Sequence, residues 1–162
     1  MVRFFHVSKY GYCMRRISNT MDRQVWLHHW QQADRFALPF PSGSFACMLF
    51  IIDADVPADE RERRCKYIVS LVCTTVLCWG RDCNIWETAI DMAHVESDPD
   101  FNPPEHINTA SYPMGSIKEA IDDAFMASCP RDEQYHSRYL ILIVGHDPMI
   151  TEEVERCIAD HA

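Results

Sequence analysis

The chain has 162 residues, 48% of them hydrophobic and 24% charged, which is the size and composition of one globular domain and excludes wholesale disorder. Its net charge of −9 argues against a general binder of nucleic acid, because affinity for phosphate backbones needs a basic surface. The longest apolar run, residues 45–52, is far shorter than the roughly 20 residues of a membrane helix. We therefore expect neither nucleic acid nor membrane as a partner.

The N-terminal residues lack the long apolar region and the cleavage site of a secretory signal. The eight cysteines lie mostly inside apolar segments, which is typical of buried free thiols in a reducing compartment. These two features predict a cytoplasmic protein.

The N-terminal segment, residues 1–38, differs in charge from the rest of the chain. It carries +4, which leaves −13 for the remainder. We expect an edge strand over residues 3–7 and a helix over residues 20–35. Aromatic residues and arginine dominate interface energetics, so the segment is predicted to contact a protein partner or a second copy of the chain. In the alternative, the same aromatic side chains cover one face of the chain's own sheet. They are Phe4, Phe5, Tyr10, Tyr12, Trp26 and Trp30.

Strands and helices alternate after the proline- and glycine-containing break at residues 39–44. Continuous apolar or β-branched runs predict strands, and helical spacing behind a capping residue predicts helices. The expected strands cover residues 45–52, 72–79, 106–112 and 139–144. Four helices are expected. The first covers residues 57–70, and the second is capped by Asp82 or Asn84. The third begins at a capping box of Ser116 and Glu119, and the fourth is capped by Thr151.

This alternation predicts an α/β fold, specifically a small three-layer flavodoxin-like or Rossmann-like domain with a mostly parallel sheet of four or five strands. Residues 39–162 form the α/β domain in this interpretation. Residues 1–38 pack on it, which gives one domain overall.

Polar side chains follow the expected strands at their carboxyl ends, where ligands bind in open α/β sheets. We predict that Asp53, Asp55, Asp82 and His146 surround one shared depression. The neighbouring side chains Trp79 and Asp147 are candidate ligand-binding residues, and His146 is a candidate acid–base group. The alternative is ordinary turn and capping chemistry.

The segment Asp53-x-Asp55 after an apolar run resembles the first motif of haloacid-dehalogenase-like phosphatases. The resemblance implies Asp53 as nucleophile, Asp55 and Asp147 as magnesium ligands, and Lys118 as the neutralising base. The chain departs from that family at Cys78-Trp79, where the family has Ser or Thr, and it lacks paired acids after the last strand. We therefore predict no metal site.

Residues 83–87, at the start of the second expected helix, resemble Toll/interleukin-receptor domains and nucleoside deoxyribosyltransferases. The resemblance implies that Glu87 acts on the ribose of NAD or a nucleoside, where a carboxylate stabilises oxocarbenium charge. Glu87 and Asp53 are then the catalytic pair. The alternative is that Glu87 only complements the positive end of its helix.

Cysteine spacing gives no C-x-x-C pair, so a closed zinc site is not expected. Cys83 lies at a helix N-terminus, where the thiolate is favoured, and is the cysteine to test for reactivity. In the alternative it is a buried, inert thiol. Trp86 is expected to be buried beside Ile90 and Ala93. The sequence contains no glycine-rich phosphate loop, and no cofactor is expected.

Residues 49–55, 78–86 and 140–144 together resemble a group of small uncharacterised bacterial α/β proteins, over about residues 45–145. The resemblance implies the fold and no activity. The sequence thus favours an accessory or interaction module that binds a protein partner or small ligand without turnover. The alternatives are a nucleotide-directed glycoside hydrolase and a magnesium-dependent phosphatase-like enzyme.

Overall fold

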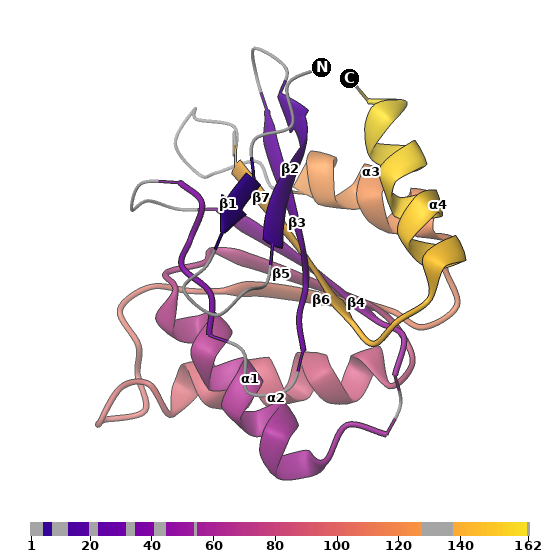
Figure 1. The fold of residues 1–162 in the computed structure, drawn as a ribbon. Helices are drawn as coiled ribbons and strands as arrows, with labels where there is room; N and C mark the ends of the chain where they lie inside the picture. The colour runs from indigo at the N-terminus through magenta and orange to yellow at the C-terminus, as the bar shows by residue number, and fades with distance from the viewer. Residues whose placement is uncertain are drawn as a thin grey trace.

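The structure, a computed structural model, describes residues 5–7, 13–19, 23–31, 35–40, 45–53, 55–127 and 138–161. These residues form a mixed seven-stranded sheet in the order β1-β2-β3-β7-β4-β5-β6, together with four helices (Figure 1). The strands are β1 (Phe5–Val7), β2 (Cys13–Asn19), β3 (Gln24–His29), β4 (Ala46–Ile51), β5 (Thr75–Gly80), β6 (Asn108–Tyr112) and β7 (Arg138–Val144). The helices are α1 (Ala58–Ser70), α2 (Cys83–Val95), α3 (Ile117–Ala127) and α4 (Pro148–Ala159).

The sheet confirms the expected α/β class but is larger than the four or five strands predicted. Strands β3, β7, β4, β5 and β6 are mutually parallel. Strands β1 and β2 extend it as antiparallel pairs, so the sheet is mixed.

The helix predicted over residues 20–35 is wrong, because residues 24–29 form strand β3. This strand lies inside the sheet, hydrogen-bonded to β2 on one side and to β7 on the other. Val25, Trp26 and Leu27 are all buried, so side chains on both faces of β3 enter the core. Burial on both faces and hydrogen bonding to a strand on each side account for the strand.

The described aromatic residues of the N-terminal segment favour the second interpretation, in which they cover the chain's own sheet. Trp26 and Trp30, two of the candidates for a partner surface, are both buried in the core. Phe5 belongs to edge strand β1, as predicted for residues 3–7. Phe4, Tyr10 and Tyr12 lie outside the described residues.

The central strands β4 and β7 form the middle of the sheet. All six residues of β4 are buried, as the continuous apolar run predicts for a strand covered on both faces. Strand β7 pairs with β4 in parallel, and β5 pairs with β4 on the other side. The core is therefore organised around two neighbouring parallel strands.

The helices cover opposite faces of the sheet. Helices α1 and α2 pack on one face around Cys65, Ile68, Trp86 and Ile90. Helices α3 and α4 pack on the other face, in a second apolar cluster (Figure 1). Among the described residues, no helix is both long enough and apolar enough to cross a membrane.

Capping side chains set the start of α3 and α4. The capping box is confirmed: the Glu119 backbone N–H donates to Ser116 Oγ (3.1 Å), and the Ser116 N–H donates to a Glu119 carboxylate oxygen (2.8 Å). Helix α4 is capped by Asp147 and not by Thr151, because Asp147 Oδ1 accepts the Met149 N–H at 2.9 Å. The capping residue of α4 therefore lies four positions earlier in the chain than expected.

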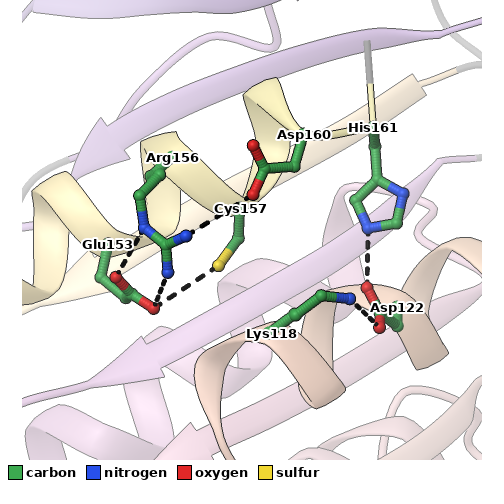
Figure 2. A network of polar contacts seen from close by, with 7 residues as sticks. All are labelled: Lys118, Asp122, Glu153, Arg156, Cys157, Asp160 and His161. Carbon is green, nitrogen blue, oxygen red and sulfur yellow. Dashed lines mark hydrogen bonds and ion pairs between the residues drawn. The ribbon is translucent and has the colours of Figure 1, made fainter.

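Polar contacts join α4 to α3 at the C-terminal end of the described chain (Figure 2). His161 Nε2 lies 2.7 Å from Asp122 Oδ1, and Lys118 Nζ lies 2.6 Å from the other oxygen of the same carboxylate. Lys118, followed by His161, lowers the pKa of Asp122 because each hydrogen-bonds to the ionised form. Along α4, Arg156 pairs with Glu153 at 2.6 Å.

Candidate functional site

The chain leaves β4 and β7 in opposite directions at the carboxyl edge of the sheet. After β4 it enters α1 on one face, and after β7 it enters α4 on the other face. In α/β sheets such a divergence between neighbouring strands opens a crevice in which ligands bind. Here the crevice is a cleft of about 740 Å³. Its polar lining consists of His29, Gln31, Asp53, Asp55, Glu60, Arg64 and His146.

The loops after β4 and β7 lie in close contact because Gly145 has no side chain. Gly145 has a φ of +101°, and a Cβ there would lie 2.8 Å from Asp53 N. The backbone N–H groups of Ile52 and Asp53 both donate to Val144 O, at 2.8 and 3.2 Å. Asp53 Oδ1 in turn accepts the Asp55 N–H at 2.9 Å. These contacts fix Asp53 at the mouth of the cleft.

Two imidazole rings stand on the β3 and β7 side of the cleft. The ring centroids of His29 and His146 are 6.5 Å apart, with His29 half-buried and His146 exposed. Burial, followed by the positive charge of Arg15, lowers the pKa of His29. At neutral pH the His29 ring is therefore uncharged and offers one hydrogen-bond donor and one acceptor.

A buried ion pair forms the wall of the cleft on the α1 side. Glu60 and Arg64 are only 5% and 7% exposed, and Arg64 Nε donates to Glu60 Oε1 at 2.9 Å. Arg64 Nη1 donates to Trp30 O at 2.9 Å, and the guanidinium lies 5.0 Å from the centre of the Trp30 ring. The pair thereby joins α1 to the end of β3. Losing one partner of such a pair costs about 3–5 kcal/mol, because the other charge stays buried.

The structure places three of the four side chains expected around one depression at the same cleft. Asp53, Asp55 and His146 line it, and both aspartates are exposed to solvent. Asp82 lies outside the lining of the cleft. It is exposed at the start of α2, where its backbone has a φ of +52°.

The other predicted site residues make contacts within the fold and lie outside the lining of the cleft. Trp79 Nε1 donates to Gly115 O at 2.9 Å and so joins β5 to the loop before α3. Asp147 caps α4. Lys118, expected as a base beside Asp53, is on α3 and pairs with Asp122. Within the described part of the chain, no group of three or more His, Cys, Asp or Glu side chains is arranged to hold a metal ion.

Glu87 is not part of the lining of the cleft that contains Asp53. Its Oε2 atom accepts a hydrogen bond from Ser111 Oγ, on β6, at 2.5 Å. Strand β5 separates β6 from β4 in the sheet, so α2 holds Glu87 on the far side of β5 from the cleft. The two carboxylates of the expected catalytic pair are therefore set apart by the strand order.

Cys83 is fully buried, and burial raises its pKa above the ordinary value for a thiol. The expected activation at the N-terminus of α2 is thus outweighed by loss of hydration. The structure favours the alternative of an inert thiol.

Sequence reasoning missed the contributions of β3 and α1 to the cleft. His29 and Gln31 were assigned to a helix, so their place at a strand end was not foreseen. Glu60 and Arg64 have the four-residue spacing of an ordinary surface ion pair. The polar residues directly after the apolar segment 25–27 were the available signal for a strand end there.

The fold and the cleft define an α/β protein with a polar crevice at the carboxyl edge of a largely parallel sheet. The chain belongs to the family described as Domain of unknown function (DUF7684), whose model matches residues 25–161. The match begins within β3 and includes every strand and helix that lines the cleft. The comparisons with curated proteins and with solved structures gave no match.

Proposed function

We propose that this protein binds a small polar molecule in the cleft between the ends of β3, β7 and β4, without converting it chemically. The observation that carries the proposal is the position of the cleft. It opens where the chain diverges from two neighbouring parallel strands, and three strand ends contribute polar side chains to it.

The lining indicates the kind of ligand. Asp53 and Asp55 are exposed carboxylates, which only accept hydrogen bonds when ionised. His29, uncharged at neutral pH, adds one donor and one acceptor. A molecule that presents several O–H or N–H groups, such as a polyol, an amine or a nucleoside, matches these acceptors.

The strand order supports a Rossmann-like version of this site. Counted from β4, the strands β6, β5, β4 and β7 stand in the order 3-2-1-4, which is the first part of the Rossmann order 3-2-1-4-5-6, and the cleft is at the switch point between β4 and β7. We also propose a cytoplasmic location. In support, Cys47, Cys65, Cys73, Cys78, Cys83 and Cys157 are free, buried thiols.

The glycoside-hydrolase alternative is less well supported, because Glu87 bonds to Ser111 outside the cleft. The phosphatase-like alternative is less well supported, because Lys118 is paired with Asp122 on α3 and is not part of the lining that contains Asp53.

The test is a thermal-shift screen of polyols, amines and nucleosides, followed by calorimetric titration of the hits. A ligand at 100 times its Kd stabilises the folded state by about 2.7 kcal/mol. That corresponds to a rise in Tm of roughly 5–10 °C for a chain of this size. We expect Asp53→Asn and His146→Gln to weaken binding at least tenfold.

Glu87→Gln is the matched control, because it also removes one carboxylate charge at the carboxyl side of a strand but lies outside the cleft. It should leave Kd unchanged. Hits that bind the two cleft variants as tightly as the parent protein contradict the proposal. Release of free base from NAD or a nucleoside, lost in Glu87→Gln, establishes the hydrolase instead.

A further inference from the structure

We propose that the ligand of the cleft carries an anionic group, phosphate or carboxylate, and that this group binds in a basic groove beside the cleft. The inference rests on the proposed function and narrows its ligand class. The basic groove is an open hollow of about 500 Å³ along α1, whose lining includes Trp30, Arg35, Arg63, Arg64, Lys66 and Tyr67.

The lining of the basic groove is rich in cationic side chains, although the protein as a whole is acidic. Among the described residues of its lining four are cationic and one, Glu60, is acidic, whereas the chain as a whole carries −9. Three carboxylates outside that lining pair with Arg63 and Lys66, namely Asp59, Glu62 and Glu96. The positive charge that these pairs leave uncompensated, at Arg35 and at the weakly paired Arg63, attracts an anion to the groove, while the acidic remainder of the protein repels it.

The basic groove adjoins the cleft. Trp30, Glu60 and Arg64 line both hollows, so the Glu60–Arg64 pair and the Trp30 backbone form their common wall. One molecule that reaches over this wall meets the carboxylates Asp53 and Asp55 on one side and the arginines on the other. The two sides therefore suit a ligand with hydroxyl or amino groups at one end and an anion at the other.

Arg35 and Arg63 are the arginines available for the anion. Among the described residues no carboxylate pairs with Arg35, whose guanidinium lies 6.0 Å from the centre of the Tyr67 ring. Arg63 Nη2 lies 3.8 Å from Asp59 Oδ2, and both side chains are largely exposed, so this ion pair is weak. A guanidinium binds phosphate or carboxylate through two parallel hydrogen bonds.

The remaining cations contribute mainly to the shape of the groove. Arg64 is buried and paired with Glu60. Lys66 Nζ lies 2.6 Å from Glu62 Oε1 and 3.3 Å from Glu96 Oε2. Substitution of Arg35 and Arg63 thus removes anion binding while the wall remains intact.

The experiment is an NMR titration of the full chain with inorganic phosphate, and separately with acetate, at constant ionic strength. The guanidinium Nε–H signals report on each arginine. We expect saturable shifts at Arg35 and Arg63, and at least tenfold weaker binding in the Arg35→Gln/Arg63→Gln double variant. Arg156→Gln, an exposed arginine on α4, is the matched control and should bind as the parent does. The arm that saturates at lower concentration identifies the anion as phosphate or carboxylate.

Equal, non-saturating shifts at Arg35, Arg63 and Arg156 in both titrations overturn the inference. Asp53→Asn separates it from the proposed function, because this variant should retain anion binding. Anion binding without any cleft ligand in the thermal-shift screen contradicts the proposed function alone. Cleft ligands whose affinity is unchanged by the double variant contradict the anionic group alone.

Discussion

Two glycines at strand ends shape the carboxyl edge of the sheet. Gly80, at the end of β5, has a φ of +100°, and a Cβ there would lie 2.2 Å from Ile51 O. Gly145 has a similar φ and would place a Cβ against Asp53. Backbone conformations of this kind are favourable only for glycine. The polar strand-end residues could be predicted from the sequence. The close contact that positions Asp53 could not, because it depends on the backbone φ of Gly145, which the sequence alone does not determine.

Gly145→Ala should destabilise the protein by about 1–3 kcal/mol, because a non-glycine residue is strained at this positive φ and its Cβ overlaps Asp53. Urea denaturation measures the loss. Gly115→Ala is the matched control, since the nearest atom to its added Cβ would be 3.5 Å away. Equal stability of the two variants would show that the loops at Gly145 move apart freely.

Individual helices and strands were predictable where one local pattern was unambiguous. Strands β4 and β7 are continuous apolar runs, and they are buried in the centre of the sheet. The helix expected over residues 20–35 is wrong, because residues 24–29 form strand β3. Its hydrogen bonding to β2 and β7 stabilises it as a strand, and pairing with strands distant in the sequence cannot be predicted from the local residue pattern.

Helix α2 is anchored to the sheet by Trp86, which is 1% exposed and packs in the cluster that includes Ile90 and Ala93, as predicted. Trp86→Ala should lower the free energy of unfolding by about 3–5 kcal/mol, since it deletes a large buried side chain. Ile85→Ala, on the exposed face of the same helix, should have a much smaller effect because Ile85 is 43% exposed. Chemical denaturation compares them, and similar losses would contradict a buried anchor at Trp86.

The arrangement of the whole sheet decides which predicted site residues meet. The return of the chain through α3 inserts β7 between β3 and β4, which brings His146 to Asp53. The same order leaves β5 between Asp53 and the strand that bonds to Glu87. Alternating strands and helices predict a polar edge, but they do not fix strand order. The composition of the cleft was therefore only partly predictable.

Strand β3 also makes part of the N-terminal segment essential to the sheet. A chain that starts at residue 39 lacks β3, whose six residues pair with β7 and whose Val25, Trp26 and Leu27 are buried. We expect it not to fold cooperatively. A chain that starts at residue 23 loses, among the described elements, β1 and β2 with the ion pair between Arg15 and Glu155, and it retains the family-matched region. It should unfold cooperatively at a lower Tm.

Circular dichroism in the near ultraviolet during thermal unfolding distinguishes the two chains, with the full chain as reference. A cooperative transition in the chain that starts at residue 39 would contradict a structural role for β3. Light scattering on the same samples tests the expected self-association through residues 1–38. If the full chain is a dimer and the chain from residue 23 a monomer, the contact surface lies in the part that precedes β3. If the full chain is a monomer, that expectation is wrong, and the basic N-terminal residues serve the chain's own sheet.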